Sequence, residues 1–385
     1  MGKIKQLSLE NYDEISKLSQ FAFQYTLNSE QVSKKREEAM RHKIFGYMID
    51  NKMAAKLHII PLNIMINKSL FKMGGISSVA TWPEYRKRGI AKKLMYHSLQ
   101  EMKKMGLSIS FLHPFHFGFY RNYGWELGFV NQKLTIPIEN FQYEWLGKGK
   151  VRRDFNNIDL LQEIYTKFAH NYNGMLIRDK KWWKQRVLTD DEVQIAIAYD
   201  DNEAAVGYII YKVRDDVFIT QEMAYESING RNLIYNFIKN HDSMIKKIKI
   251  TVSENDMLPY YLNYPYYKQE MEPYFMARIV DVYEFLKNYP FNKVEEEINL
   301  CVEDEFYEEN SSCYRITLQH GEVDIIKTNE IKGINCSIQQ LTSICLGFKR
   351  PKNLYDNQLI FGDEKEIKKL ENLIPRNETN FTDFF

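Results

Sequence analysis

Apolar residues in the first part of the chain recur with two spacings, one typical of helices and one typical of strands. Residues 12–25 and 30–41 carry apolar side chains at helical intervals, which predicts two amphipathic helices. Short apolar runs between turn residues predict strands at residues 44–49, 53–60, 62–66 and 77–81. With a strand at the N-terminus, the expected order is strand, two helices, then a group of strands.

A third amphipathic helix is expected over residues 89–106. Its apolar side chains gather on one half of a helical wheel: Ile90, Ala91, Leu94, Met95, Leu99, Met102 and Met105. Most of its lysines fall on the other half, and Gly106 is a typical helix stop. A short buried strand is predicted at residues 107–112, and an aromatic segment, residues 117–129, follows it.

The remaining chain divides into two further regions. A change in composition at residues 147–150 is followed by predicted helices at 157–170, around 182–186 and at 234–241, and by predicted strands at 193–199, 205–213, 217–224 and 248–252. From Pro290 onward, strands are expected at 294–302, 314–318 and 322–327, then helices at 337–346 and 365–373. We therefore predict domains at residues 1–147, 148–289 and 290–385, the last with an α+β pattern.

Composition narrows the class of protein. The chain has 385 residues, a formal net charge of +1 and 44% hydrophobic residues, enough for two or three packed cores. The balanced charge does not favour a nucleic-acid or anionic-membrane partner. No apolar run reaches membrane-spanning length, and the N-terminus does not resemble a signal peptide. A cytoplasmic protein is expected.

The four cysteines give a further expectation. Cys301, Cys313, Cys336 and Cys345 show no CxxC spacing. Free, partly buried thiols are therefore favoured over metal ligands. His113 and His116 form a His-x-x-His pair, but without an accompanying carboxylate or cysteine they favour structural or substrate-lining roles, and no metal is expected.

Candidate chemistry begins at the basic loop before the third helix. Arg86, Lys87 and Arg88 precede Gly89, and the helix start offers unpaired N–H groups and the positive end of the helix dipole. This arrangement suits a pyrophosphate, and Gly89 would let backbone approach it closely. The loop is neither a P-loop nor a GxGxxG fingerprint. A solvated basic surface is the alternative.

Two motifs resemble those of the GNAT acetyltransferases. Arg86-x-x-Gly89-x-Ala91 resembles the GNAT pyrophosphate loop, and Phe119-Tyr120-Arg121-Asn122-Tyr123-Gly124 resembles the segment that carries the GNAT catalytic tyrosine. The resemblance implies an acetyl-CoA site formed by Ser78, Val79, Ala80, Arg86, Lys87, Arg88, Gly89, Ile90 and Ala91. In it, the Val79 N–H would bind the thioester oxygen and Tyr120 would protonate the thiolate. Taken alone, one of 26 tyrosines is more often a packed core ring.

The whole chain resembles the Eis (enhanced intracellular survival) family. The implied fold is α/β plus α+β, with tandem GNAT-like mixed-sheet domains followed by a sterol-carrier-like domain. The second GNAT-like domain lacks an Arg-x-x-Gly-x-Ala loop, so no cofactor is expected there. The resemblance also implies a homohexamer, and a C-terminal carboxylate, here that of Phe385, that acts as general base in the first domain. A frayed tail is the alternative for Phe385.

The acceptor is expected to be a primary amine of a small molecule, such as a polyamine or an aminoglycoside, which attacks the thioester of acetyl-CoA directly. Candidate substrate-binding residues are Phe23, Tyr25, Phe115 and Phe384, and Phe117 is a further candidate pocket wall. Core packing is the alternative for Phe23, Tyr25, Phe115 and Phe117. The mycobacterial family member has acidic residues where this chain has Tyr25 and Phe384, so two charge-assisted contacts to an aminoglycoside would be missing. A protein lysine acetyltransferase and a non-enzymatic acyl-CoA or lipid carrier are the alternative functions.

Overall fold

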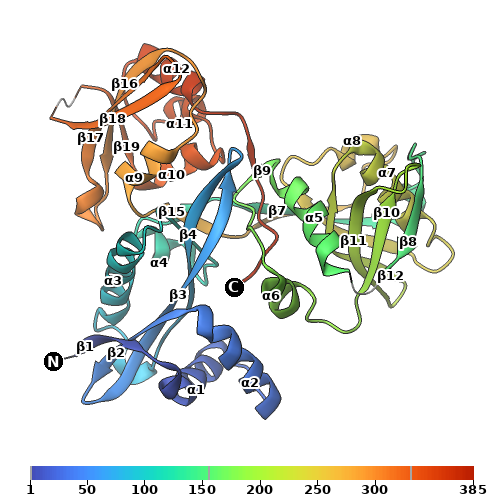
Figure 1. The fold of residues 1–385 in the computed structure, drawn as a ribbon, viewed down its shortest axis with the longest axis horizontal. Coiled ribbons are helices and arrows are strands. Elements are labelled where there is room, and N and C mark those ends of the chain that lie inside the picture. The colour runs from blue at the N-terminus through green and yellow to red at the C-terminus, as the bar shows by residue number, and fades with distance from the viewer. Residues whose placement is uncertain (1, 155–156, 330–331) are drawn as a thin grey trace. The chain divides into compact units, whose positions relative to one another are not determined.

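The computed structural model describes residues 2–154, 157–329 and 332–385 (Figure 1). It divides into two compact units that are both discontinuous in sequence. The first unit comprises Met1–Gly128, Phe275–Arg376 and Phe385, and the second comprises Phe129–Tyr274 and Asn377–Phe384. In the described residues, no helix is long and apolar enough to cross a membrane.

The first unit contains a mixed seven-stranded sheet in the order β1-β2-β3-β4-β5-β15-β6. Its strands are β1 (Lys3–Leu7), β2 (Lys43–Ile49), β3 (Lys52–Ile66), β4 (Ser69–Thr81), β5 (Ile109–Leu112), β6 (Glu126–Leu127) and β15 (Met276–Ile279). Its helices are α1 (Tyr12–Phe23), α2 (Ser29–Glu38), α3 (Ile90–Lys104) and α4 (Phe117–Arg121). These elements confirm the predicted helices and the strand order up to residue 112.

One prediction in this sheet was wrong. Residues 53–60 and 62–66 were expected to form two strands, but they form the single strand β3, which runs through Pro61. The pairing of β3 with β2 ends at Ile59, so no strand hydrogen-bonds to that side of β3 at Pro61 in the described residues. Because proline lacks only the N–H that such a partner would need, the strand continues without a break.

Strand β4 carries a bulge near its C-terminal end. Lys56 pairs with Ala80 and His58 pairs with Ser77, so two residues of β4, Ser78 and Val79, lie opposite Leu57. Ser78 has a φ of +55°, which is the left-handed region. The parallel pairing of β4 with β5 ends at Ile76, before the bulge. Beyond Ile76 one edge of β4 therefore has no strand partner among the described residues, and its backbone groups can serve a ligand.

The rest of the first unit is an α+β subdomain with the sheet order β18-β17-β16-β19. Its strands are β16 (Glu296–Glu303), β17 (Ser312–Gln319), β18 (Glu322–Thr328) and β19 (Ile334–Ser337). Its helices are α9 (Val282–Asn288), α10 (Ile338–Leu346), α11 (Pro351–Asp356) and α12 (Glu364–Leu373). Strands followed by helices confirm the predicted pattern, and the predicted hairpin turn at His320 and Gly321 has positive φ at both residues.

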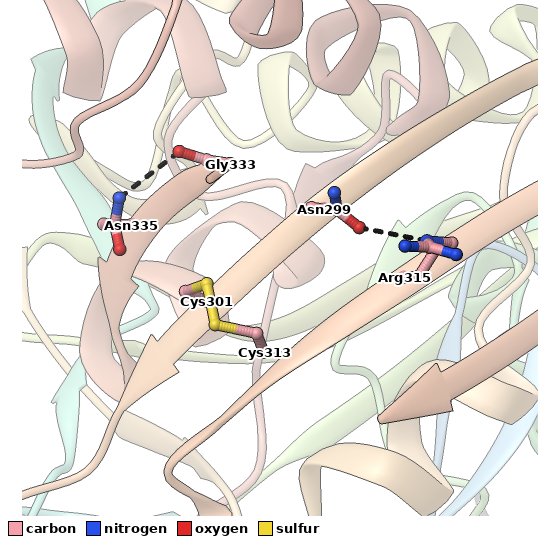
Figure 2. Close-up of a disulfide and its surroundings, with 6 residues drawn as sticks. All are labelled: Asn299, Cys301, Cys313, Arg315, Gly333 and Asn335. Atoms are coloured by element: carbon pink, nitrogen blue, oxygen red, sulfur yellow. Dashed lines mark hydrogen bonds between the residues drawn. A yellow bond between two sulfur atoms is a disulfide. The ribbon is translucent and has the colours of Figure 1, made fainter. Parts of the chain in front are cut away.

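The structure corrects the expectation of four free thiols. Cys301 and Cys313 form a disulfide, whereas Cys336 and Cys345 are free and buried (Figure 2). The two bonded residues face each other directly across the antiparallel pair β16–β17. Cross-strand neighbours bring their Cβ atoms within reach of such a bond. The prediction failed because it searched for CxxC spacing rather than for the register of a hairpin.

The second unit contains another seven-stranded sheet, in the order β14-β7-β13-β12-β11-β10-β8. Its strands are β7 (Val130–Pro137), β8 (Lys150–Arg153), β10 (Gln194–Tyr199), β11 (Ala205–Arg214), β12 (Val217–Tyr225), β13 (Lys247–Ser253) and β14 (Lys268–Pro273). Its helices are α5 (Ile158–Ala169), α6 (Lys180–Trp182) with a π-helical turn (Trp183–Val187), α7 (Ile228–Lys239) and α8 (Leu258–Tyr261). The helix expected at residues 234–241 thus begins earlier, at Ile228.

The strand pairing differs from the domain boundaries expected at residues 147 and 289. Strand β7 belongs to the second sheet, between β14 and β13, although it precedes residue 147. Strand β15 belongs to the first sheet, between β5 and β6, although it follows the second sheet's strands in sequence. A change in composition marks a loop, whereas hydrogen bonding across the sheet decides which domain a strand completes.

The second unit also holds the segment Asn377–Phe384. Strand β20 (Glu378–Thr379) pairs in parallel with β9 (Tyr172–Asn173). Farther along, the buried Asp383 accepts hydrogen bonds from Arg178 at 3.0 Å and from the Trp182 indole at 2.6 Å. Arg178 also forms a buried ion pair with Glu222 at 2.5 Å. These contacts fix residues 378–383 on the second unit.

Candidate functional site

A cavity of about 680 Å³ lies in the first unit, beside the bulged end of β4 and the start of α3. The lining residues that the sequence predicted are Phe23, Val79, Ala80, Arg86, Lys87, Gly89, Ile90, Ala91 and Phe115. Those that sequence reasoning did not assign to a site are Ala22, Thr81, Tyr85, Lys92, Phe119 and Tyr123. The predicted loop, the predicted strand and two of the predicted aromatic residues therefore surround one cavity.

The start of α3 provides the polar end of this cavity. Gly89 is the N-cap residue with a φ of +69°, and no side chain caps the N–H groups of the first turn. A Cβ at Gly89 would meet no atom within 4 Å. Glycine is favoured here because the backbone is left-handed, and its lack of a side chain keeps the space beside the helix start open. N–H groups at a helix start without a side-chain cap, with Arg86 and Lys87 beside them, can bind an anion.

The bulge of β4 provides the second backbone element. Val79 and Ala80 line the cavity, and the bulge places Val79 where the ladder with β3 is interrupted. An extra residue in a bulge is left out of the regular pairing, so its backbone groups are available to a ligand. Ser78, which was expected among the cofactor residues, lies beside this wall, and its side chain bonds to the protein interior instead.

Aromatic side chains form the opposite wall. Phe115, Phe119 and Tyr123 line the cavity, and Tyr120 lies behind them, with its ring 5.5 Å from that of Phe115 and 5.1 Å from that of Phe119. Tyr120 is only 3% exposed. Burial, together with the neighbouring Tyr123, raises the pKa of Tyr120 well above its usual value. The phenol therefore stays protonated, as a proton donor must, but it is a weaker acid than a free tyrosine.

The glycine that follows this aromatic segment has a packing role. Gly124 has a φ of +84°, and a Cβ there would lie 1.9 Å from the Arg278 guanidinium. Arg278 donates a hydrogen bond to the Tyr123 carbonyl and forms an ion pair with Asp304 at 2.5 Å, with all of its side chain buried. Gly124 thus lets an arginine from β15 hold the end of the aromatic segment that carries Tyr120.

Phe385 lies in the first unit. Its ring is 5.0 Å from that of Phe275, and the side chain is 6% exposed. A Cβ at Gly75 would meet the Phe385 ring at 2.7 Å, so the last residue packs on β4 ahead of the bulge. Phe385 is therefore packed rather than frayed, although it does not line the cavity.

Three other predicted residues do not line the cavity. Phe384 belongs to the second unit and is 54% exposed. Tyr25 follows α1 and is 40% exposed. Arg88 packs its guanidinium 5.5 Å from the centre of the Tyr85 ring. Sequence reasoning missed Phe119 and Tyr123 although both lie in the motif that identified Tyr120, because only the tyrosine was given a role.

The histidines and Glu126 have structural partners. The His116 ring accepts a hydrogen bond from the Phe119 N–H at 3.1 Å and so caps α4. His113 packs edge-on against Phe275 at 5.4 Å. Arg121 binds both carboxylate oxygens of Glu126, at 3.0 and 2.9 Å. These contacts favour the structural interpretation of both histidines, and Glu126 is held in an ion pair.

Comparisons with known families identify the domains. Residues 3–128 and residues 174–279 each match an acetyltransferase (GNAT) domain, and residues 282–382 match a sterol carrier protein domain. The chain thus consists of two GNAT domains followed by a sterol carrier domain, which confirms the predicted fold class. Two uncharacterized N-acetyltransferases, both from Streptomyces griseus, are 26% identical over 125 residues. That match spans 29% of this chain and 29% of each relative.

Solved structures extend the similarity to the whole chain. A conserved protein of unknown function from Enterococcus faecalis, described as a probable N-acyltransferase, is 25% identical with a TM-score of 0.93 and full coverage of both chains. A GCN5-related N-acetyltransferase from Anabaena variabilis is 23% identical with a TM-score of 0.89, also with full coverage of both. Eis1 from Mycobacterium abscessus is 15% identical with a TM-score of 0.84 and full coverage. The last two show a shared fold.

Proposed function

We propose that the protein is an N-acetyltransferase that transfers the acetyl group of acetyl-CoA to a primary amine of a small molecule. The observation that carries this proposal is the single cavity bounded by an uncapped helix start, a bulged strand and the aromatic segment of Tyr120. The two GNAT domains and the similarity to N-acetyltransferases support the same reaction. The Eis family assignment remains part of this proposal.

The residues at the polar end of the cavity fit the pyrophosphate of acetyl-CoA. Arg86 and Lys87 supply positive charge, and the N–H groups after Gly89 supply donors. Acetyl-CoA contributes an activated acetyl thioester. The cavity extends from this polar end to Val79 and Phe115, which offers room for the thioester arm.

Three groups are proposed for the chemistry. The Val79 N–H stabilises the negative charge that develops on the acetyl oxygen. Tyr120 donates its proton to the departing sulfur, and its raised pKa keeps that proton in place beforehand. The α-carboxylate of Phe385 takes a proton from the amine nitrogen as the new bond forms. Attack is direct, without a covalent enzyme intermediate.

The acceptor end of the cavity favours a small amine. Phe23, Phe115, Phe119 and Tyr123 supply aromatic faces, which attract an ammonium group. Among the described residues that line the cavity there is no aspartate or glutamate. Asp383 is buried in ion pairs, and Glu30 pairs with Lys34 at 2.7 Å. A mono- or diamine therefore fits better than a highly charged aminoglycoside.

The lipid-carrier alternative has less support. The cavity of about 330 Å³ in the sterol carrier domain is lined largely by charged side chains: Glu297, Lys332, Asp363, Glu366 and Lys369. A lipid tail needs an apolar tunnel, so this cavity does not suit one.

Thiol release measured with a panel of polyamines, aminoglycosides and lysine peptides tests the proposal. Turnover with small amines is expected, and turnover restricted to lysine peptides would instead indicate a protein acetyltransferase. Extending the C-terminus with a hexahistidine tag moves the α-carboxylate, so kcat should fall while acetyl-CoA affinity and Tm stay unchanged. Equal kcat for tagged and untagged protein would remove Phe385 from the mechanism. The homohexamer and the cytoplasmic location stay predictions, which mass measurement in solution and cell fractionation test.

A further inference from the structure

A second cavity, of about 250 Å³, lies in the second unit where β12 and β13 separate. These parallel strands pair over residues 217–219 and 247–249, and both continue beyond that pairing. Residues 221–223 of β12 and residues 251–253 of β13 then line the cavity. The first sheet separates in the same way beyond the pairing of β4 with β5. The second GNAT domain thus also has a cavity beside its separated central strands.

Three aromatic side chains line this second cavity: Phe168, Tyr172 and Tyr225. The Phe168 ring lies 5.1 Å from the ring of Tyr172 and 5.4 Å from the ring of Tyr225. Phe168 is buried, and both tyrosines are partly exposed. Aromatic faces attract organic cations and also pack against short apolar chains. This part of the lining therefore suits an ammonium ion that carries an alkyl chain.

The charged side chains that line the second cavity are mostly negative: Glu222, Asp256 and Glu272, with Lys133. Glu222 is paired with Arg178, and Glu272 is paired with Lys133 at 2.7 Å. Asp256 forms no ion pair with any described residue. It is therefore the carboxylate of this lining whose charge a cationic ligand could balance.

The electrostatic environment of Asp256 supports this interpretation. Burial raises the pKa of the Asp256 carboxyl, and this effect exceeds the lowering by the Leu258 N–H and Arg231. After burial, the charge of Asp256 is the next largest factor that raises the pKa of Tyr172 and that of Tyr225. The field of the carboxylate therefore reaches the same rings that line the cavity.

A structural role accounts for only part of Asp256. Its Oδ1 accepts a hydrogen bond from the Leu258 N–H at 2.7 Å, at the start of α8. An uncharged asparagine or serine could accept that bond equally well. A partly buried carboxylate costs more desolvation free energy than a neutral side chain, and the helix start does not require it.

Other classes of ligand fit this cavity less well. An anion would meet the carboxylates, and Lys133 is already paired. No group of three or more side chains that could hold a metal ion occurs in residues 2–154, 157–329 and 332–385. A lipid tail would leave polar groups of the lining, such as Asn131 and Asn380, without water or a partner.

We propose that the cavity of the second GNAT domain binds a small alkylammonium ion, with its nitrogen beside Asp256 and its chain against the three aromatic rings. The lining belongs to the second unit, whereas the cavity proposed for acetyl-CoA is lined by residues of the first unit. This binding site goes beyond the proposed function and does not depend on it.

NMR of labelled methionine methyl groups tests the proposal, because Met223 lines the second cavity. No methionine is among the described residues that line the first cavity, so the Met223 signal distinguishes the two. n-Butylamine is titrated into the whole protein at neutral pH, and Met223→Leu identifies the signal. We expect a saturable shift with n-butylamine and none with n-butanol, which has the same chain without the charge. The absence of a saturable shift with n-butylamine, or an equal response to n-butanol, would overturn the proposal.

Asp256→Asn tests the carboxylate. Asparagine keeps the hydrogen bond to the Leu258 N–H and removes the charge, so the n-butylamine Kd should rise about tenfold or more. Asp201→Asn, at an exposed aspartate of the same unit, is the matched control and should bind as wild type does. An unchanged Kd in Asp256→Asn would overturn the proposal.

Tyr225 tests the aromatic part of the lining. Tyr225→Phe keeps the ring and should bind n-butylamine as wild type does, whereas Tyr225→Leu should weaken binding about threefold. The signals of the other methionines show whether each variant is folded. Equal affinity in a folded Tyr225→Leu would contradict the placement of the chain against the rings.

A lysine peptide with blocked ends distinguishes a free amine from a protein side chain that carries the same ammonium group. Its Kd should be weaker than that of n-butylamine by about tenfold, because the peptide backbone has to be accommodated as well. Equal affinity for the peptide would overturn the assignment to a small amine. None of these measurements needs acetyl transfer, so a protein that acetylates no amine would overturn the proposed function and leave this inference standing.

Discussion

The two GNAT domains share a fold but differ at the start of the helix that follows the central strands. In the first domain the N-cap of α3 is Gly89, and no side chain bonds to the first turn. In the second domain the N-cap of α7 is Ser227, whose hydroxyl accepts a hydrogen bond from the Gly230 N–H at 3.2 Å. In a capped helix the side-chain oxygen already accepts a hydrogen bond from a first-turn N–H group, so that N–H group cannot also donate to an anion.

The bulges of the two domains differ in the same way. In the second domain β11 and β12 also shift register, and Gln221 is the extra residue. Its amide bonds to the Val187 carbonyl at 2.7 Å, and the adjacent Glu222 pairs with Arg178. In the first domain Ser78, within the bulge, accepts a hydrogen bond from Lys56, which forms no ion pair with any described residue. The comparison shows that the GNAT fold is retained in the second domain although its bulge residue and its helix start form hydrogen bonds within the protein.

The largest expected effect comes from removing the buried cation of the second domain. Arg178→Met leaves Glu222 and Asp383 buried without their partner, so the free energy of unfolding should fall by about 3–5 kcal/mol. Denaturant unfolding measures this, with Arg214→Met, an exposed arginine, as control. Burial raises the pKa of Glu222, but the ion pair outweighs it and lowers that pKa. Wild-type stability should therefore decline below about pH 4.5 as the glutamate is protonated, and this decline should be absent from Arg178→Met.

Tyr120→Phe tests the acid of the first domain. The ring packing is retained and one proton donor is lost, so kcat should fall by about 10²-fold, with little change in acetyl-CoA affinity. Steady-state kinetics and calorimetry give the two quantities. Tyr96→Phe, on the outer part of α3, is the control, and undiminished turnover in Tyr120→Phe would show that the thiolate leaves without this acid.

Gly89→Val tests the uncapped helix start directly. The side chain enters the open space beside the first turn and strains the left-handed backbone, so the acetyl-CoA Kd should rise at least tenfold, about 1.4 kcal/mol. Gly321→Val introduces similar strain at a hairpin turn with a φ of +80° and open space around it. Equal acetyl-CoA affinity in both variants would mean that the loop does not contact the cofactor.

The smallest effect is expected from uncapping the second domain. Ser227→Ala should lower the free energy of unfolding by about 1 kcal/mol, whereas Ser227→Asn, which keeps a capping oxygen, should stay near wild type. Neither variant should bind a second acetyl-CoA, because the basic residues of the first loop have no counterpart there. If calorimetry detected a second acetyl-CoA site in Ser227→Ala, the Ser227 cap alone would be what prevents the second domain from binding acetyl-CoA.

The sequence predicted more of the residues at the polar end of the cavity than of those at its aromatic end. The loop from Arg86 to Ala91 and the motif around Tyr120 are each contiguous in sequence, so their resemblance to GNAT motifs could be seen without a structure. The buried Lys56 escaped notice because its hydrogen bonds to Ser78 join β3 to β4 at a bulge. A lysine inside an apolar run such as residues 53–60 gives no sign that it is wholly buried.

Most helices and strands were also predictable, since their apolar periodicity is local. The sequence did not predict that β7 belongs to the second sheet and β15 to the first. Strands more than a hundred residues away in the sequence pair with them and so decide this. The same limit applies to the Cys301–Cys313 bond, which depends on the register of β16 and β17. In each case the missing information lies in the alignment of two strands.

The discontinuity of both units has a consequence for synthesis on the ribosome. The sheet of the first GNAT domain lacks β15 until residue 279 has been made, so β5 and β6 have no strand between them until then. The second unit lacks Asp383, and with it one partner of Arg178, until almost the whole chain has emerged. The first sheet cannot be completed before residue 279 has emerged, and the second unit cannot reach its final packing before Asp383 has. We therefore expect nascent chains to depend on protection during translation, and fragments cut at residue 147 or 289 to aggregate.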